Sequence, residues 1–414
     1  MRFAVVMALC GLCAGTLLGA DNWPQFLGSH GDGHADTTDL PVSWSETSNV
    51  VWKTPIHGRG WSSPVIWGQQ IWMGTAKEDG KEFFAVCADK DTGKILHDIK
   101  LFESEKPDFC HALNSYASPT PVMEEGRVYM HFGSYGTACL DTTADGKVLW
   151  SRKDLPCNHW RGPGSSPILY QDLLIVHYDG YDLQYIVALN KNTGETVWKK
   201  TRDVEYGTTD GDVMKAYSTP IVIDVNGQQQ LISTTSKAVL AYEPLTGKEI
   251  WRVRYDGFSS TARPIYGLGM VFISTGFGKA QVYAIKPDGT GDVTDTHVVW
   301  KANKGVPSMP SFVLVGERIY MCSDSGVASC LNALTGATVW QNRLEGQFSA
   351  SMLFAEGRVY FPSREGTTTV VAAADEYKVL SENKLEDGCM ASPAAIGKSL
   401  FLRTKTHLYR IENK

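Results

Sequence analysis

The sequence predicts an all-β fold, an eight-bladed β-propeller built from four-stranded antiparallel blades. A turn that ends in a fixed tryptophan returns along the chain, and short strands with a two-residue alternation separate the copies. No segment shows a sustained helical period. The 40 glycines and 12 tryptophans among 414 residues suit a chain of many tight turns packed by large rings.

The repeated turn places a glycine four residues before a tryptophan. It reads Asn190-Lys-Asn-Thr-Gly194-Glu-Thr-Val-Trp198, and further copies are Glu243–Trp251, Asn332–Trp340 and the shorter Asp145–Trp150. Asparagine or aspartate at the start of a turn bonds nearby backbone, and glycine accepts a positive φ. We expect each tryptophan to lie in an outer strand and to cover the gap to the neighbouring blade.

Each blade is expected to open with a small residue and, in most cases, a proline before its innermost strand. The eight openings are Ser63-Pro64, Ser118-Pro119, Ser166-Pro167, Thr219-Pro220, Arg263-Pro264, Met309-Pro310, Ala350-Ser351 and Ser392-Pro393. The last repeat, Cys389–Lys414, has material for three strands only. We expect Asn49-Val-Val-Trp52-Lys53 to supply its missing outer strand, which closes the ring through the termini and removes an open edge.

Residues 1–20 are predicted to be a secretory signal peptide and residues 21–414 a single propeller domain. The apolar run after Arg2 is short, and polar residues follow it at once, which favours a cleaved signal over a membrane span. The residues before Cys13 do not match a lipidation site, so a lipid anchor is not expected. The mature protein is predicted to be periplasmic or secreted, with no membrane-spanning segment.

The charge distribution argues against nucleic acid as a partner. The formal net charge is −6, and no basic stripe or arginine-rich run occurs.

The cysteines are divided into two groups. Removing the signal takes away two of nine and leaves seven, an odd number, so at least one stays unpaired within the chain. Cys87, Cys139 and Cys330 occupy corresponding small-residue positions and are expected to be buried packing residues. Cys110 and Cys157 lie in corresponding loops of adjacent blades, where a disulfide is possible in an oxidising compartment.

The repeat resembles the PQQ-like β-propeller repeat, the fold of quinoprotein alcohol dehydrogenases and of the outer-membrane assembly factor BamB. The pattern Ala-x-Asn/Asp-x-x-Thr-Gly-x-x-x-Trp carries this resemblance, and Asn22–Gly28 is similar to secreted bacterial members of the superfamily. The resemblance implies the fold. It says little about function, because the motif is a packing device.

Quinone chemistry is not the expected function. The dehydrogenases of the superfamily carry adjacent cysteines against the cofactor, and this chain has no Cys-Cys pair. It also lacks their long insertions, and their calcium ligands and catalytic aspartate cannot be carried onto it. We therefore expect neither a metal nor a cofactor, with PQQ kept as a less favoured alternative, and we assign no catalytic residue.

The candidate binding residues lie in three loops that lead into the innermost strands. These loops are Glu103–Asn114, Cys157–Arg161 and Val204–Lys215, and loops on a rigid ring are where propellers bind. The proposed ligand-binding residues are His111, Asn114, His159, Trp160 and Arg161, which suit a polar or anionic ligand or a glycan.

Two further sets of residues are interpreted as structural. The aromatic residues ahead of four blade openings are expected to pack between blades: Trp61, Tyr116, Tyr217 and Phe348. His131 and His177 hold equivalent positions in adjacent blades, but no third metal ligand is evident.

The favoured function is an exported, non-enzymatic binding or scaffold protein, BamB-like in architecture, whose partner is an envelope protein or a small polar ligand. The alternatives are a divergent quinoprotein oxidoreductase and a carbohydrate-active or carbohydrate-binding propeller. Whether the protein is an enzyme is left open, with binding preferred.

Overall fold

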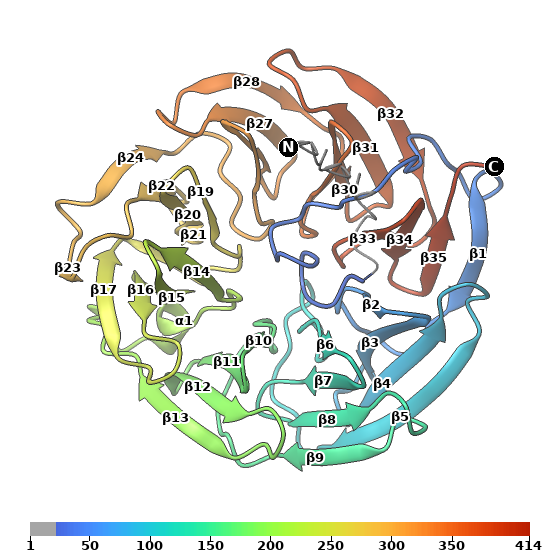
Figure 1. Cartoon of the computed structure of the whole chain (residues 1–414), viewed down its shortest axis with the longest axis horizontal. Coiled ribbons are helices and arrows are strands. Elements are labelled where there is room, and N and C mark those ends of the chain that lie inside the picture. The colour runs from blue at the N-terminus through green and yellow to red at the C-terminus, as the bar shows by residue number, and fades with distance from the viewer. Residues whose placement is uncertain (1–21) are drawn as a thin grey trace, which may run out of the picture.

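The computed structural model describes residues 22–414 and forms a closed ring of blades around a central channel (Figure 1). Eight sheets radiate from the channel, seven of four strands and one of five. Within the described residues the helical content is one short helix, α1 (Gly211–Met214). The predicted all-β, eight-bladed class is confirmed. The predicted signal peptide, residues 1–20, lies outside the described residues.

The first four blades follow one another along the chain, each built outwards from the channel. Blade 1 contains β2 (Val65–Trp67), β3 (Gln70–Ala76), β4 (Glu82–Asp89) and β5 (Ile95–Glu103). Blade 2 contains β6 (Val122–Glu124), β7 (Arg127–His131), β8 (Thr137–Asp141) and β9 (Val148–Arg152). Blade 3 contains β10 (Ile168–Tyr170), β11 (Leu173–Asp179), β12 (Gln184–Asn190) and β13 (Thr196–Thr201). Blade 4 contains β14 (Ile221–Val225), β15 (Gln228–Thr234), β16 (Ala238–Tyr242) and β17 (Glu249–Arg254).

The second half continues the pattern. Blade 5 contains β19 (Ile265–Gly267), β20 (Met270–Ser274), β22 (Val282–Ile285) and β24 (Val298–Ala302). Its excursion β23 (Gly291–Asp292) pairs in parallel with β17 and gives blade 4 its fifth strand. Blade 6 contains β25 (Val313–Val315), β26 (Arg318–Cys322), β27 (Val327–Asn332) and β28 (Thr338–Arg343). Blade 7 contains β29 (Leu353–Ala355), β30 (Arg358–Pro362), β31 (Thr367–Ala372) and β32 (Val379–Lys384).

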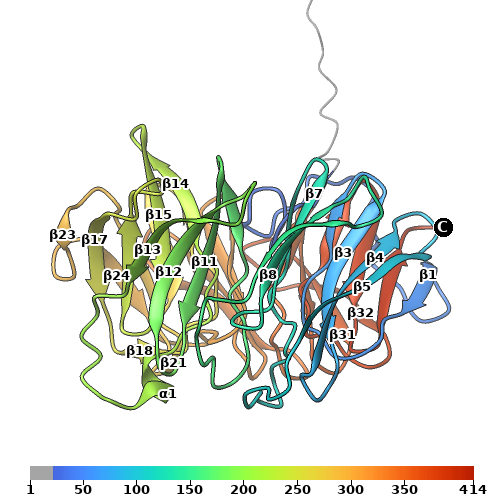
Figure 2. The ribbon, with the colours of Figure 1, turned by 90° about the horizontal axis from the view of Figure 1, so that it is seen from below.

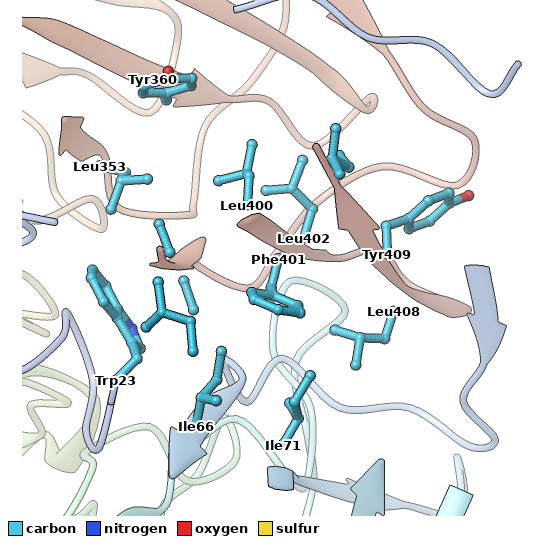
Figure 3. Packing of buried hydrophobic residues seen from close by; sticks show 14 of the residues in the cluster. Trp23, Ile66, Ile71, Leu353, Tyr360, Leu400, Phe401, Leu402, Leu408 and Tyr409 are labelled. Atoms are coloured by element: carbon cyan, nitrogen blue, oxygen red, sulfur yellow. The ribbon is translucent and has the colours of Figure 1, made fainter. Parts of the chain in front are cut away.

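Blade 8 closes the ring by combining the two ends of the chain. Its strands β33 (Ala394–Ile396), β34 (Ser399–Arg403) and β35 (His407–Ile411) are completed by β1 (Val50–Pro55), which pairs antiparallel with β35. This confirms the predicted closure. An apolar cluster seals the joint, with side chains from blades 7, 8 and 1 and from the N-terminal Trp23 packed together (Figure 3). The closed ring leaves no open edge between first and last blades.

The tryptophan of one blade packs on the turn glycine of the next, as the repeat predicts. A Cβ added to Gly194 of blade 3 would lie 2.6 Å from the ring of Trp150 in blade 2. The Trp150 indole N–H donates to the carbonyl of Lys191 in the same turn (2.9 Å). The remaining pairs of this kind repeat both contacts: Trp52 on Gly93, Trp198 on Gly247 and Trp300 on Gly336.

The small residues opposite the outer strand are buried, as expected. Cys87, Cys139 and Cys330 are each 0% exposed and carry free thiols. Cys139 and Cys330 stand opposite Trp150 and Trp340 in their own blades, where a small side chain leaves room for the rings.

The segment from residue 22 to residue 45 crosses one face of the ring and covers the end of the channel. Trp23 forms a bridge with Ile66 of blade 1, and the carbonyl of Pro24 accepts the N–H of Met123 in blade 2 (2.7 Å). Across the channel Arg263 of blade 5 donates to the carbonyl of Phe26 (2.5 Å), and His34 forms a bridge with Phe354 of blade 7. These contacts hold the segment across the ring's centre (Figure 1).

The two faces of the ring are therefore different. The side view places α1 and the small ribbon of β18 (Gly257–Phe258) and β21 (Phe277–Gly278) together on one face (Figure 2). Among residues 22–414, no helix is long and apolar enough to cross a membrane.

Three histidines are buried: His131 in blade 2, His177 in blade 3 and His159 in the loop between these blades. His131 is paired with Thr137 (2.8 Å), and His177 bonds the carbonyl of Ser218 and the hydroxyl of Ser233 (both 2.9 Å). Burial lowers the pKa of His131 to about 3 and that of His159 to about 4, and it holds the pKa of His177 well below its usual value. These partners make the histidines structural.

Gly194→Ala should destabilise the ring more than Gly269→Ala. Both glycines have positive φ, +76° and +70°, but only Gly194 faces an indole, while Gly269 has open space. We expect a loss of about 1–3 kcal/mol at Gly194 beyond the backbone cost shared by both. Chemical denaturation measures the difference. Equal losses would contradict the docking role of Trp150.

Stability should fall as the pH drops from 7 to 5. The unfolded chain gains protons on its histidines near pH 6.5, whereas the folded chain does not until about pH 4 or below. His131 and His159 should thus each contribute a loss of about 2 kcal/mol over this interval, His177 should contribute a loss in the same direction, and the contributions should be flat above pH 7. Urea denaturation at several pH values tests this. A free energy of unfolding that stays constant from pH 7 to 5 would contradict it.

Candidate functional site

A cavity of ≈ 480 Å³ lies on the channel axis and opens between the long loops. Every blade contributes one residue to its wall from the position four before its innermost strand. In blade order these residues are Trp61, Ser118, Gly164, Tyr217, Thr261, Met309, Ser349 and Met390. Phe26 from the N-terminal segment also lines the cavity, so the cavity ends at that segment.

A ring of hydroxyl groups surrounds the inner end of the cavity. Each hydroxyl oxygen accepts a backbone N–H from the corresponding residue of another blade at 2.9–3.0 Å, and the last bond, from Ser392 to Ser63, runs across the joint between the chain ends. The hydroxyl residues are Ser63, Thr120, Ser166, Thr219, Ser311, Ser351 and Ser392. Blade 5 has Arg263 at this position. Because each oxygen accepts, its own proton stays available to donate.

The positions of these hydroxyl residues show that two of the predicted blade openings are wrong. Blade 2 opens at Thr120-Pro121 and blade 6 at Ser311-Phe312, each two residues after the predicted Ser118-Pro119 and Met309-Pro310. The feature that these blades share is a serine or threonine two residues before the innermost strand. Proline does not mark this position reliably, because prolines also occur at neighbouring positions.

The four aromatic residues ahead of the blade openings fall into two pairs with different roles. Trp61 and Tyr217 line the cavity, whereas they were expected to pack between blades. Tyr116 and Phe348 do pack: Tyr116 meets Phe83 edge to face at 6.4 Å, and Phe348 is 1% exposed.

Three charged side chains form the wall near the mouth. Arg161 donates from Nε and Nη2 to the two carboxylate oxygens of Asp212 (both 3.1 Å), and Lys215 Nζ lies 2.6 Å from Asp212 Oδ1. Lys215 also donates to Ser259 Oγ (2.9 Å). Burial acts to raise the pKa of Asp212, but these hydrogen bonds hold it below its usual value. Burial lowers the pKa of Lys215, against the attraction of Asp212.

Three of the five predicted binding residues line the cavity: His111, Asn114 and Arg161. The Asn114 side-chain amide donates to the carbonyl of Arg161 (2.9 Å) and so fastens the loop of one blade to that of the next. Burial, and then the positive charge of Arg161, lower the pKa of His111. His111 is therefore neutral at pH 7.

The other two predicted residues do not line the cavity. His159 is 7% exposed and its Nε2 accepts the N–H of Ser134 (3.0 Å), so it supports the loop from inside. Trp160 has a φ of 60° and lies outside the cavity, with its ring 6.0 Å from that of Phe109 and 4.9 Å from that of Tyr181.

The disulfide considered for Cys110 and Cys157 is not present in the structure. Both thiols are free. Cys110 Sγ lies 3.7 Å from the carbonyl of Arg161, and Cys157 Sγ lies 3.7 Å from the carbonyl of Leu183 in its own blade. The two cysteines occupy corresponding loops, but each thiol packs against backbone. Burial raises the pKa of Cys110 to about 11.

The residues present do not fit a calcium-bound quinone. Among residues 22–414, no three His, Cys, Asp or Glu side chains gather to hold a metal ion. Asp212 is the single carboxylate among the described residues that line the cavity, and both its oxygens already bond cations. A divalent ion needs several free oxygen ligands.

Comparison with known proteins places the chain in a family. A family model described as "Outer membrane protein assembly factor BamB" matches residues 45–210 and 182–413. Methanol dehydrogenase [cytochrome c] subunit 1 of Methylobacterium organophilum is 27% identical over 155 residues, which are 33% of this chain and 23% of that protein. The chain thus matches less than a quarter of that relative's length.

Solved structures repeat the architecture at low sequence identity. BamB from Moraxella catarrhalis superposes with a TM-score of 0.61 at 12% identity, over 87% of this chain and 99% of its own. The quinohemoprotein alcohol dehydrogenase from Comamonas testosteroni gives a TM-score of 0.68 at 11% identity, over 95% of this chain and 81% of its own. These likenesses show the PQQ-like propeller fold. Together with the family match over both halves, they show that the chain belongs to the family described as outer membrane protein assembly factor BamB.

Proposed function

We propose that the protein is an exported binding scaffold of the cell envelope, which recognises a partner protein through the loop-bearing face. The observation that carries this proposal is a row of three exposed aromatic rings beside the cavity mouth. Phe109, Trp160 and Tyr181 form this row, which we name the rim cluster. Their exposed fractions are 56%, 37% and 37%.

The rim cluster has the composition of a binding surface. It joins rings from three loops of blades 1 to 3, and the exposed Leu113 and Leu183 belong to the same loops. Contiguous exposed apolar groups mark interaction sites, and aromatic side chains carry much of the energy at interfaces. The rigid ring holds these loops with little freedom to lose on binding.

Acidic residues beside the rings favour a basic partner segment. Asp108 precedes Phe109 and Asp182 follows Tyr181 in the chain, and within the described residues neither forms a salt bridge. Burial, and then the nearby negative charge of Asp182, raise the pKa of Asp108. A lysine or arginine placed against the rings would gain both cation–π and ionic attraction.

The family membership supports a role in the envelope. The matching family is described as outer membrane protein assembly factor BamB, and one similar solved structure is a BamB. The predicted signal peptide supplies the route of export that such a role needs.

Replacing Trp160 and Tyr181 together by serine should abolish capture of the partner from an envelope extract. Tyr266→Ser is the matched control, since Tyr266 on blade 5 is also 37% exposed. Loss of two interface rings should weaken binding by about 2–4 kcal/mol, or thirtyfold or more. Affinity capture with quantitative mass spectrometry compares the three proteins. If the double variant captures the same proteins as the wild type, the rim cluster is not the docking site; a glycan that binds instead would support the carbohydrate alternative.

A divergent quinoprotein oxidoreductase is the second candidate. The aromatic-walled cavity on the channel axis and the partial match to methanol dehydrogenase favour it. The side chains that line the cavity argue against this candidate, because Asp212 is the single carboxylate among the described lining residues and both its oxygens already bond cations. Titration with PQQ and calcium, read by the quinone absorption and by dye reduction with alcohols, decides between the two. Dye reduction that depends on both additions would establish this candidate.

A further inference from the structure

We propose that the axial cavity binds a small organic monoanion with a compact apolar body, a site separate from the rim cluster. The proposal goes beyond the scaffold role and stands on the charges, donors and walls of the cavity.

The cavity wall carries one more cation than it has carboxylates. Arg161 and Lys215 share the single carboxylate of Asp212. His111 adds no charge at neutral pH. Asp212 pairs with the buried Lys215, of whose side chain 1% is exposed, because a buried charge needs a partner. The surplus positive charge lies with Arg161, whose side chain is 38% exposed. One negative charge from a ligand would balance the site.

Arg161 has an unbonded N–H group that can donate to the negative charge of the ligand. Its Nε and Nη2 bond Asp212, while Nη1 forms no hydrogen bond to any described residue. Lys215 is fully engaged, because its Nζ bonds the Asp212 carbonyl, the Asp212 carboxylate and Ser259. A ligand carboxylate would therefore accept from Arg161 Nη1, with Lys215 contributing its charge. Charge-assisted bonds of this kind are the strong ones.

Large apolar side chains form much of the rest of the wall. The cavity volume of ≈ 480 Å³ lies within the range of small-molecule sites. The large apolar side chains that line it include Phe26, Trp61, Tyr217, Phe258, Met309 and Met390. Aromatic rings and thioethers together favour a flat or polarisable ligand.

The hydroxyl ring adds a weaker preference at the inner end. Ser63, Thr120, Ser166 and Thr219 line the cavity, and their oxygens already accept backbone N–H groups. Their protons can donate to a neutral acceptor such as a ligand carbonyl or ether. Among the described residues that line the cavity, no second free cation could meet a second full negative charge, so a monoanion fits better than a polyanion.

The test compares 2-naphthoate with the neutral 2-naphthamide by isothermal titration calorimetry. We expect 2-naphthoate to bind at one site per chain and at least tenfold more tightly than 2-naphthamide. Arg161→Gln should remove most of that preference, a roughly ten- to hundredfold loss of affinity for the acid. Arg318→Gln is the matched control, because Arg318 forms a similar bidentate pair with Asp375 on the exposed surface.

The Asp212→Asn variant tests the direction in which the affinity for 2-naphthoate changes. It removes the internal anion that competes for Arg161, so the acid should bind several-fold more tightly, whereas a purely structural Asp212 would give weaker or unchanged binding. Circular dichroism verifies the folding of each variant, and the rim-cluster double variant should bind 2-naphthoate as the wild type does. The proposal is overturned if the amide binds as well as the acid, if neither binds at millimolar concentration, if Arg318→Gln matches Arg161→Gln, or if only the trianionic PQQ binds.

Discussion

The contact on which the structure depends is the packing of an outer-strand tryptophan of one blade against the turn glycine of the next blade. An indole such as Trp150 needs a flat surface, and Gly194 provides one because it has no side chain. The indole N–H of Trp150 then donates to the carbonyl of Lys191 in this turn, which would otherwise lack a hydrogen-bond partner. At the inner edge the hydroxyl ring performs the same task with hydrogen bonds. At the four joints with an indole–glycine contact, the two blades are thus fixed at both their outer and their inner edges.

This rigidity explains why the functional features lie in loops that do not repeat. The repeated positions are occupied by docking, so chemistry is left to the long loops of blades 1 to 5 and to the positions where a blade departs from the pattern. Lys215, Phe258 and Ser259 are such departures, all on one face. The N-terminal segment covers the other end of the channel, so the cavity opens towards the loop-bearing face.

Much of the fold could be predicted because its signals are local. The Gly194–Trp198 turn and the orphan strand around Trp52 carry their chemistry within a few residues. The site was harder to predict, since Arg161 and Asp212 lie 51 residues apart in the chain and meet only through the ring. Sequence could not show that the positive φ of Trp160 places its ring outside the cavity while its neighbour Arg161 faces inwards. The hydroxyl ring did have a sequence signal, a serine or threonine two residues before seven inner strands, which neighbouring prolines concealed in blade 2.

The proposed site on the channel axis has one surplus positive charge, which a ligand monoanion balances. A crystal structure of the full protein with 2-naphthoate tests this most directly. We expect the naphthalene body between Trp61 and Tyr217, with the carboxylate bonded to Arg161 Nη1 and Asp212 still paired to Lys215. A ligand bound only at the rim cluster, or an empty cavity at saturating ligand, would contradict it.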